Sequence, residues 1–475
     1  MKASPILFFK ILIFTSLIQA SNRPNVIFIL ADDMGWNNLA CYGSDLHETP
    51  HLDELANQGV AFTEAYSASP VCTPTRASIL TGKDPARLQM TVWREAAAQR
   101  RDRKVLEPVT LDTLPTEHLT LAEVLRDAGY FTAHIGKWHL GRAEGYPQPH
   151  GFKVNIGGTL WGAPESFFYP YNELANDYFE SWRYVPDLEP GKKGDYLTDR
   201  LTDKALELIE AKRDEPFFIN LWYHSVHTPV EGKPELVEKY KRKILEEEPI
   251  VHKNPHLAAM VESMDENVGR IVAKLKELSL THKTLVIFTS DNGGYTGNCR
   301  LNPNLPVTNN SPLRSGKGSC YEGGIRVPLI VRAPGLGRGV VCREPVSSID
   351  FYPTILKLLR EDEGATQEVD GVDISLLLRV PGTKLERDTL YFHYPHYYKT
   401  TTPVSAVRQG NWKMLRYYED GKVELYDLAS DPAETTDLSE VFPARVKLLS
   451  LKLDLWLKKT EAQLPEENPR LADAR

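Results

Sequence analysis

The sequence contains few cysteines, and none of them has the spacing of a zinc ligand. Only five occur in 475 residues: Cys41, Cys72, Cys299, Cys320 and Cys342. No Cys-x-x-Cys or Cys/His grouping is present, so nothing indicates a structural zinc site. Cys299 and Cys320 could bridge a loop, which the sequence leaves open. The odd total indicates one thiol with another fate.

Long hydrophobic runs are missing after the first 20 residues. Lys2 and Lys10 flank the apolar run ILIFTSLI, and Ala20 provides a small residue at its end. This pattern predicts a signal peptide over residues 1–20, with a buried N-terminal strand as the alternative. The run is shorter than the ~20 residues of a membrane span, and no later segment approaches that length. No cysteine follows directly, so we expect an exported protein, periplasmic or secreted, without a membrane anchor.

An excess of basic charge is absent too. The formal net charge is −8 and the lysines and arginines are dispersed, so no nucleic-acid partner is predicted. No internal repeat or low-complexity tract is found. With 41% hydrophobic and 25% charged residues, the composition is that of a soluble globular protein. A chain of this length can form one large core and a smaller appended domain.

Short apolar runs alternate with amphipathic helical patterns along most of the chain. Thr120 and Glu123 form a capping box that begins a helix, which ends at Gly129 and is followed by a strand up to Gly136. The segment 25–30 also reads as a buried strand, as do 217–224 and 284–290, which follow helical patterns. This alternation predicts an α/β fold with a large, mostly parallel sheet flanked by helices.

The pattern changes from about residue 400. Asp420-Gly421 separates two alternating runs, which is a β-hairpin signal, and a helix is predicted over 443–459. We therefore expect a large N-terminal domain over 21–399, which would be the catalytic one. A small α+β domain with a short antiparallel sheet is expected over 400–475.

Oxygen-rich groups follow two of the predicted strands. Asp32 and Asp33 come directly after one buried strand, and Asp291 and Asn292 follow another. In open α/β sheets, sites gather at the carboxyl ends of strands, and hard divalent cations prefer oxygen ligands. The alternatives are ordinary turns and helix caps, because Asp is common there and Asn-Gly is a strong turn signal. Together the two groups make a metal site as good an explanation as turns and caps.

Cys72 lies at the predicted start of a helix. Thr73 is the expected N-cap and Pro74 the first helical residue, so Cys72 and Arg76 lie near free N–H groups that favour an anion. A buried or disulfide-bonded cysteine is the alternative. A phosphatase-type thiolate loop is disfavoured, because it needs five residues between Cys and Arg and this segment has three.

Cationic and imidazole side chains occur in three further short motifs. IGKWHLG carries Lys137 and His139, HSVHTP carries His224 and His227, and RSGKGSCYEGG carries Lys317. Each alone is better explained by a solvated loop lysine or a histidine satisfied in the core. Together with the carboxylates at strand ends, they indicate hydrolysis of a sulfate or phosphate ester, with a cation and basic groups around an oxyanion.

These motifs resemble those of one family. CTPTRASILTG is similar to the sulfatase signature, and GKWHLG, HTP, DNGG and GKGSCYEGGIRVP resemble that family's other motifs in the same order. The resemblance runs from about residue 24 to 336, and ELYDLASDPAE near the C-terminus also fits. It points to the type I, formylglycine-dependent sulfatases of the alkaline phosphatase superfamily, and it implies an alkaline-phosphatase-like sandwich fold.

The resemblance also implies roles for the site residues. A maturation enzyme would oxidise Cys72 to formylglycine, with Pro74 and Arg76 in its recognition signal. The hydrated aldehyde has two hydroxyls: one attacks sulfur, and the other later loses its proton so that sulfate is expelled. One calcium ion would be held by Asp32, Asp33, Asp291 and Asn292, together with residue 72.

The remaining residues would handle the diol and the sulfate group. By the same resemblance, Arg76 and Lys137 orient the diol, and His139 helps to expel sulfate. His227 and Lys317 would bind the sulfate ester, and one of them would assist the leaving oxygen.

Two other functions are compatible with parts of this pattern. Phosphonate and phosphate-ester hydrolases share the superfamily, but many use Ser or Thr and two zinc ions. A catalytically inactive carbohydrate-binding homologue would lack one of Cys72, Arg76 or Lys317, and none is lost.

The expected substrate is a sulfated carbohydrate. The segment 391–403 is rich in aromatics and histidine, and could form a pocket rim or be core strand and loop. As a rim, Tyr391, Phe392, Tyr394, Tyr397 and Tyr398 would stack on sugar rings, and His393 and His396 would donate to hydroxyls or a sulfate. Such a rim would suit removal of sulfate from a terminal sugar.

Overall fold

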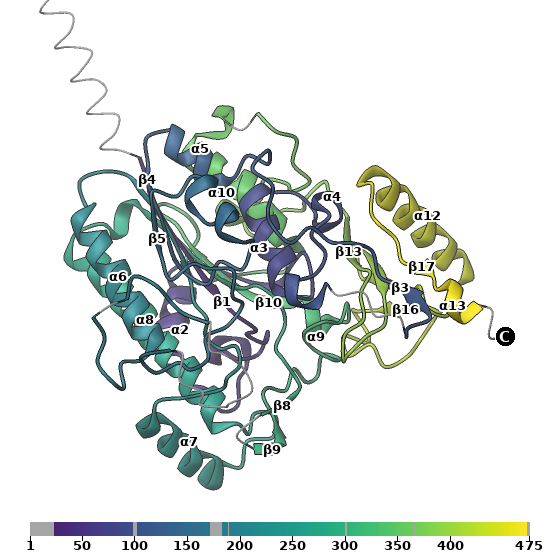
Figure 1. Ribbon diagram of the computed structural model, residues 1–475, viewed down its shortest axis with the longest axis horizontal. Coiled ribbons are helices and arrows are strands. Elements are labelled where there is room, and N and C mark those ends of the chain that lie inside the picture. The colour runs from purple at the N-terminus through teal and green to yellow at the C-terminus, as the bar shows by residue number, and fades with distance from the viewer. Residues whose placement is uncertain are drawn as a thin grey trace, which may run out of the picture.

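A computed structural model describes residues 23–472, apart from 98–101, 172–182, 189, 300–301 and 365. The predicted signal peptide lies outside the described residues. Figure 1 shows a large α/β body with a smaller domain, coloured yellow, at one end. The five cysteines all lie in the described part of the chain, and none forms a disulfide.

The large body is built on a nine-stranded sheet. Its order is β11-β2-β10-β7-β1-β6-β4-β5, with β12 also paired to β2. The strands are β1 (Asn25–Ala31), β2 (Val60–Tyr66), β4 (Phe131–Gly136), β5 (Val154–Ile156), β6 (Phe217–Trp222), β7 (Thr284–Ser290), β10 (Arg326–Arg332), β11 (Val340–Cys342) and β12 (Val346–Ser347). Only β10 runs antiparallel to its neighbours, β2 and β7. The prediction of a mostly parallel sheet is therefore confirmed.

Helices cover both faces of this sheet (Figure 1). One face carries α2 (Pro50–Asn57), α6 (Leu197–Ala211) and α8 (Pro255–Glu277), and the other carries α3 (Cys72–Thr81), α5 (Leu121–Asp127), α10 (Phe351–Leu359) and α11 (Ser375–Arg379). Because side chains alternate along a strand, Ile27 and Ile29 of β1 pack with the first group, and Phe28 and Leu30 with the second. The core is thus split into two layers.

Several local predictions are confirmed. The capping box of Thr120 and Glu123 begins α5, and Glu123 also accepts a hydrogen bond from the Thr120 backbone N–H. The helical patterns before 217–224 and 284–290 are α6 and α8, and the strands that follow are β6 and β7. Shorter elements connect these parts: α4 (Pro85–Leu88), α7 (Pro234–Glu247), α9 (Glu322–Ile325), and the paired strands β8 (Asn298–Cys299) and β9 (Asn302–Pro306).

The smaller domain is an antiparallel sheet of β13 (Thr389–Tyr394), β14 (Val404–Gln409), β15 (Trp412–Tyr417) and β16 (Val423–Asp427), covered by α12 (Pro443–Lys459). The hairpin at Asp420-Gly421 joins β15 to β16, and the helix over 443–459 is α12, both as predicted. The boundary expected at residue 400 cuts this sheet, because β13 pairs with β14 along its whole length. Two further short elements, β17 (Glu466–Glu467) and α13 (Pro469–Ala472), end the described chain, and β17 pairs with β3 (Val105–Leu106).

A buried ion cluster joins the two domains. Lys413 of β15 is fully buried and lies 2.9 Å from carboxylate oxygens of both Glu322 and Glu434. Glu322 belongs to α9, directly after the glycine-rich segment that carries Lys317. Because breaking a buried pair leaves an uncompensated charge, this cluster ties the small domain firmly to that segment.

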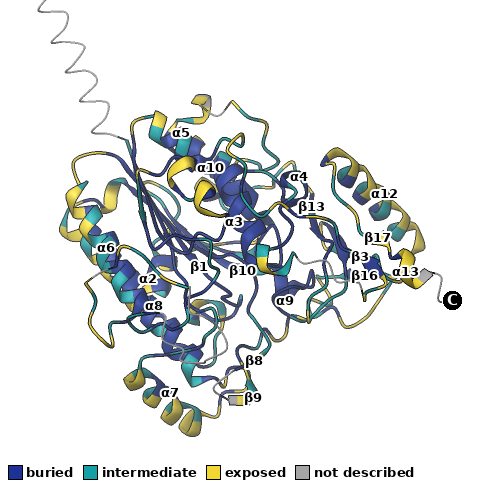
Figure 2. Ribbon diagram, in the orientation of Figure 1, coloured by how far each residue is buried: buried dark blue, intermediate teal, exposed yellow. Residues whose placement is uncertain are grey.

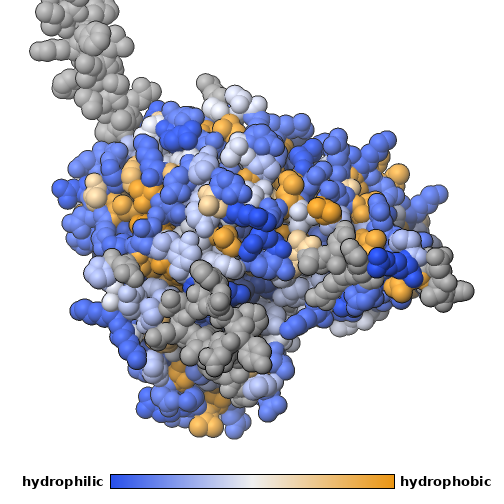
Figure 3. Space-filling view, in the orientation of Figure 1, coloured by the Kyte–Doolittle hydropathy of each residue, from blue (hydrophilic) through white to orange (hydrophobic). Residues whose placement is uncertain are grey.

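The surface shows no broad apolar face in the view drawn in Figure 3, where hydrophobic residues lie in small groups between polar ones. Figure 2 shows how burial differs between the helices: α3 is buried along its whole length, whereas α12 exposes one side. Among the helices of the described residues, none is both long and apolar enough to cross a membrane.

Candidate active site

Four neighbouring parallel strands, β7-β1-β6-β4, deliver most of the predicted site residues. Each strand ends at the same edge of the sheet, and the polar residues follow directly: Asp291 and Asn292 after β7, Asp32 and Asp33 after β1, His227 after β6, and Lys137 and His139 after β4. The strand order therefore brings together groups that are far apart in the sequence.

Cys72 faces this edge from the first turn of α3. The helix begins at Cys72 with Val71 as its N-cap, so the expectations of Thr73 as N-cap and Pro74 as the first helical residue are both wrong. The Thr73 hydroxyl instead donates to the backbone oxygen of His139 at 2.8 Å. Burial raises the pKa of the Cys72 thiol to about 11, although Lys137 and Lys317 lower it. An unmodified Cys72 is therefore a protonated thiol at neutral pH, which is a poor nucleophile.

Arg76, one turn further along α3, contacts residues that follow two of these strands, β7 and β4. Its Nε donates to Asp291 Oδ2 at 2.8 Å, and its NH2 nitrogen lies 2.7 Å from the same oxygen. Its NH1 nitrogen donates to the Lys137 backbone oxygen at 2.9 Å. The side chain is fully buried and its charged carbon lies 5.1 Å from the centre of the Trp222 ring. Burial raises the pKa of Asp291, but the nearby cations, Arg76 foremost, together lower it more, so the pKa lies below its usual range.

Lys137 pairs with the first carboxylate of the acidic pair. Its Nζ lies 2.6 Å from Asp32 Oδ2, and both side chains are fully buried. Burial nevertheless raises the pKa of Asp32 to about 8, with Lys137 opposing and Asp291 adding to the rise. Such a carboxyl group is poorly compensated by the protein alone and favours an additional positive charge nearby.

Asp33 contacts both residues that are expected to bind the sulfate ester, Lys317 and His227. Lys317 Nζ lies 2.7 Å from Asp33 Oδ1 and 3.4 Å from Cys72 Sγ, and His227 Nε2 lies 3.5 Å from Asp33 Oδ2. Burial raises the pKa of Asp33, but Lys317 and His227 lower it more, so it stays ionised. Asp33 in turn holds the pKa of Lys317 well above its usual range, despite burial.

The donor atoms fit a hard cation. Ligand atoms of Asp32, Asp33, Cys72 and His227 lie within 4.8 Å of one another. Asn292 donates to Asp33 Oδ1 at 2.8 Å through its amide nitrogen. Its own oxygen and Asp32 Oδ1 are buried without a hydrogen-bond partner in the described part of the chain. Buried acceptors of this kind are costly unless a ligand or water meets them, so these oxygens suit a hard cation.

His139 lines the same cavity as Cys72 and has a partner that the sequence did not reveal. Its Nε2 is 3.4 Å from Glu95 Oε2. Burial lowers the pKa of His139 to about 4, although Glu95 raises it. Glu95 lies in the segment 85–97, outside every motif that carried the sequence argument, so its role could not be predicted.

A cavity of about 230 Å³ opens onto this site. Of the predicted residues, Asp33, Cys72, His139, His227 and Lys317 line it, while Arg76, Lys137 and Asp291 support it from behind. His224 is buried and does not line the cavity. The sequence did not identify the other lining residues: Trp93, Glu95, Gly162, Ala163, Arg183, Thr228 and Tyr295.

The aromatic rim predicted over 391–398 is largely wrong. His393 and His396 are both buried. His393 contacts the Ser405 hydroxyl and the Gln463 backbone oxygen, and His396 contacts the Thr91 hydroxyl. Tyr391 stacks on Trp456 at 4.9 Å, and Phe392 and Tyr394 lie in the core between the domains. Alternate residues of β13 are needed for packing on its two faces, so the strand cannot supply a rim.

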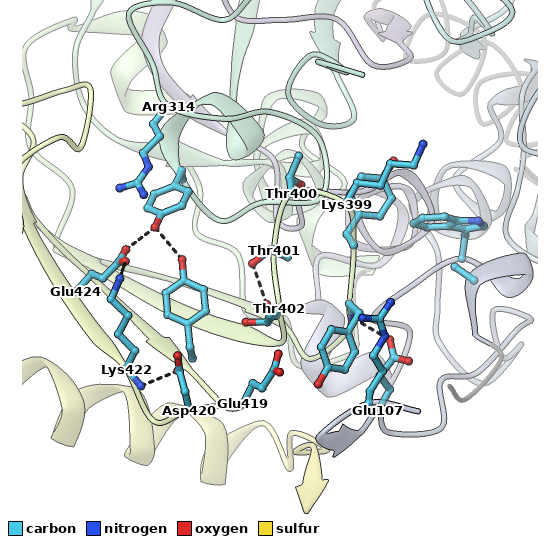
Figure 4. A pocket seen from close by; sticks show the side chains of 17 residues that line it. Glu107, Arg314, Lys399, Thr400, Thr401, Thr402, Glu419, Asp420, Lys422 and Glu424 are labelled. Atoms are coloured by element: carbon cyan, nitrogen blue, oxygen red, sulfur yellow. Dashed lines mark hydrogen bonds and ion pairs between the residues drawn. The ribbon is translucent and has the colours of Figure 1, made fainter. Parts of the chain in front are cut away.

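Tyr397 and Tyr398, just after β13, are the part of the rim that does face a cavity. Both line a larger cavity of about 700 Å³ beside the first one. Trp93 and Tyr398, whose rings meet edge to face at 5.7 Å, line both cavities. In Figure 4, Thr400, Thr401 and Thr402 lie between Arg314 and Glu424 on one side and Lys399 and Glu107 on the other. The larger cavity is thus polar with aromatic walls.

Comparison with protein families identifies the chain. The family model described as Sulfatase matches residues 24–361, which contain every predicted site residue. The chain belongs to the sulfatase family. A second family model, described as N-sulphoglucosamine sulphohydrolase, C-terminal, matches residues 316–461. As a sulfatase, this protein is a sulfuric ester hydrolase of the alkaline phosphatase superfamily.

Individual sulfatases resemble it along nearly the whole chain. A protein named Sulfatase from Formosa agariphila is 32% identical over 520 residues, covering 94% of this chain and 90% of its own. Arylsulfatase A from Homo sapiens is 31% identical over 501 residues, covering 92% and 89%. The solved structure of Ps i-CgsB in complex with k-i-k-neocarrahexaose is 28% identical, with a TM-score of 0.72 and coverage of 92% and 93%. The predicted fold class is confirmed.

Proposed function

We propose that this sulfatase removes sulfate from a carbohydrate, using a formylglycine made from Cys72 and one calcium ion. The observation that carries the proposal is the position of Cys72: its sulfur lies 3.4 Å from Lys317 Nζ, at the carboxyl edge where the acidic cluster gathers. The family relationship supports the same reading. We also propose that the protein is exported and that a formylglycine-generating enzyme converts its Cys72.

The two groups that complete the site supply distinct chemistry. Formylglycine, when hydrated, provides the attacking hydroxyl at position 72. Asp32, Asp33, Asp291 and Asn292 would hold a calcium ion beside residue 72, where it would supply positive charge to polarise a sulfate oxygen and favour the ionised form of that hydroxyl. The paired carboxylates and the free amide oxygen of Asn292 are the ligand types that calcium prefers.

The chain's own residues then have separable tasks. Lys317, held protonated by Asp33, places a positive charge against the sulfate oxygens. Burial and Lys317 lower the pKa of His227 to about 3, so its neutral ring can hydrogen-bond the substrate. Arg76 and Lys137 fix the acidic groups behind residue 72 and orient its hydroxyls. His139, neutral at physiological pH, can accept the proton whose loss releases sulfate.

The first test compares sulfate with phosphate chemistry. Protein produced with a maturation enzyme should hydrolyse a sulfate ester faster than the matched phosphate or phosphonate ester, and should contain one calcium ion per chain. Stoichiometric zinc, with activity restored only by zinc and directed to phosphate esters, would establish the phosphohydrolase alternative. A fully matured protein that binds sulfated sugar but releases no sulfate would be the inactive homologue.

The two cavities define how a glycan would lie. The smaller one, about 230 Å³, is below the roughly 300–1,000 Å³ of drug-sized ligand sites, so it suits one sulfated sugar. The larger one, across Trp93 and Tyr398, would receive the sugars that follow. This arrangement supports sulfate removal from a terminal residue of an oligosaccharide. The complex of Ps i-CgsB with a neocarrahexaose supports the same substrate class.

This placement predicts that chain length matters through Tyr397. Replacing Tyr397 with alanine should raise KM for a sulfated oligosaccharide by roughly 3–10-fold, the value of one aromatic contact, and leave the sulfated monosaccharide unchanged. Tyr397→Phe is the matched control, because it keeps the ring and loses only the hydroxyl that accepts from the Val105 N–H. Steady-state kinetics on both substrates provides the measurement. An unchanged KM for the oligosaccharide in Tyr397→Ala, as in the Tyr397→Phe control, would contradict the proposal.

A further inference from the structure

Glu95 lies against the histidine that the proposed function assigns to sulfate release. It belongs to a short 3-10 helix, Arg94–Ala96, which follows the cavity residue Trp93. Its Oε2 lies 3.4 Å from His139 Nε2, and the two side chains are 32% and 6% exposed. Both residues line the cavity that contains Cys72. The pair therefore forms one wall of the reaction site.

The His139 ring is held in one place from several sides. Its backbone N–H donates to the Thr159 oxygen at 3.0 Å, and its own backbone oxygen accepts from the Thr73 hydroxyl at 2.8 Å. The residue has a positive φ of 60°, which these two contacts secure. The ring packs flat against Gly162, where an added Cβ would come within 2.4 Å of Cε1. The imidazole thus has little freedom to turn away from Glu95.

The chemistry of this contact fixes which ring nitrogen carries hydrogen. Burial raises the pKa of Glu95, but its hydrogen bonds and the nearby positive charge, chiefly from His139, together lower it to about 2, so Glu95 is a carboxylate and can only accept. The neutral ring must then carry its hydrogen on Nε2. That leaves Nδ1 with a lone pair, and Nδ1 is buried without a hydrogen-bond partner in the described part of the chain. A buried acceptor without a partner, on a side chain that lines the cavity of Cys72, is suited to accept a proton.

We propose that Glu95 is a positioning residue, which fixes His139 in the Nε2–H tautomer and so makes Nδ1 the proton acceptor of the site. Its catalytic meaning rests on the proposed function, whereas the tautomer itself does not. A carboxylate orients a catalytic imidazole in the same way in a nucleophile–histidine–acid triad, although Glu95 is only partly buried. Here the carboxylate comes from a segment between the helix of Cys72 and the next motif.

The charge of Glu95 also supports His139 as a proton acceptor, because it raises the pKa of the ring. The ionisable groups that influence His139 are Glu95, Lys137 and Arg76; the two cations lower its pKa and Glu95 alone raises it. Removing the carboxylate should therefore lower the pKa of His139 further, weakening it as a base. A glutamine at this position could also donate to Nε2 and reverse the tautomer.

The direct test reads the tautomer by nitrogen NMR on histidine-labelled protein that keeps Cys72 unmodified, with His139→Gln used to assign the signal. Wild-type protein should show Nε2–H alone, and Glu95→Gln and Glu95→Ala should shift His139 toward the Nδ1–H form or a mixture. Glu144→Gln, which changes an exposed glutamate, is the control and should leave the signal unchanged. A wild-type ring in the Nδ1–H form, or an unchanged tautomer in both variants, would overturn the proposal.

The kinetic test uses matured enzyme. Glu95→Gln should lower kcat by about 10–100-fold with little change in KM, the range seen when an orienting partner of a functional histidine is removed. The acid limb of the kcat profile should move to lower pH, because the carboxylate that raises the pKa of His139 is gone. A changed tautomer with unchanged kcat would show that Nδ1 is not the acceptor. Failure of sulfatase activity in the wild type would instead count against the proposed function, and the NMR result would stand.

Discussion

Replacing Cys72 with serine is expected to lower kcat for sulfate release by at least ~10⁴-fold, the order of loss found when a catalytic nucleophile is removed. Serine can accept a sulfate group but has no second oxygen on Cβ through which to expel it. The variant should therefore accumulate a covalent sulfate ester at position 72, visible by peptide mass spectrometry as one added SO₃ group. Lys317 and the acidic cluster remain in place to support that single transfer.

The wild-type protein provides the matching measurement. When it is produced with a maturation enzyme, the peptide that contains Cys72 should show the aldehyde in place of the thiol. Cys41→Ser is the control, because Cys41 is exposed and should not influence turnover. A fully active enzyme that retains an unmodified thiol at position 72 would rule out the formylglycine mechanism.

Replacing Asp291 with asparagine is expected to remove most of the bound metal and to lower kcat by at least ~10²-fold, the order seen for loss of one electrostatic stabiliser. The same change leaves the Arg76 guanidinium buried, with Asp32 at 3.8 Å as its nearest remaining carboxylate. Breaking a buried ion pair costs about 3–5 kcal/mol, so the free energy of unfolding should fall by a similar amount. Metal analysis and denaturant unfolding measure the two effects separately.

The stability effect of Asp291 should depend on pH. Its pKa lies below the ordinary 3.8 in the folded protein, so its contribution is present at neutral pH and is lost as the pH falls through the folded-state pKa. The difference between wild type and variant should therefore shrink in acid. Asp112→Asn, in a surface pair with Arg142, is the control and should change stability by less than ~1 kcal/mol. Equal metal content in wild type and Asp291→Asn would contradict the proposed ligand set.

The sequence determined the large sheet and the edge at which its site lies. An apolar run such as 284–290, seven residues long and preceded by a helical pattern, indicates a buried strand, and the polar residues after it then emerge at the strand end. Short-range rules were equally reliable: the Thr120 capping box and the Asp420-Gly421 hairpin depend on neighbouring residues alone. The sequence also places Asp32, Asp33, Asp291 and Asn292 at strand ends, but their grouping requires β1 and β7 to be neighbours, which the folded sheet decides.

Only the tertiary structure decided which aromatic and histidine side chains face the substrate. The pattern of 391–398 is compatible with a rim or a core strand, because alternation does not say which face is covered. Packing of β13 between the domains buries Phe392, His393 and Tyr394, and the chain turns toward the cavity only at Tyr397. The small sheet could not be assigned to start at β13 for the same reason.

Glu95 shows the same limit for a site residue. No local spacing relates it to His139, which lies 44 residues further along the chain. Their contact exists because the chain after α3 passes over the end of β4, a path set by the packing of whole helices and strands. The chemistry-bearing motifs were therefore encoded locally, whereas the partner that orients His139 was chosen by the fold, since a long-range contact depends on every element between its two ends.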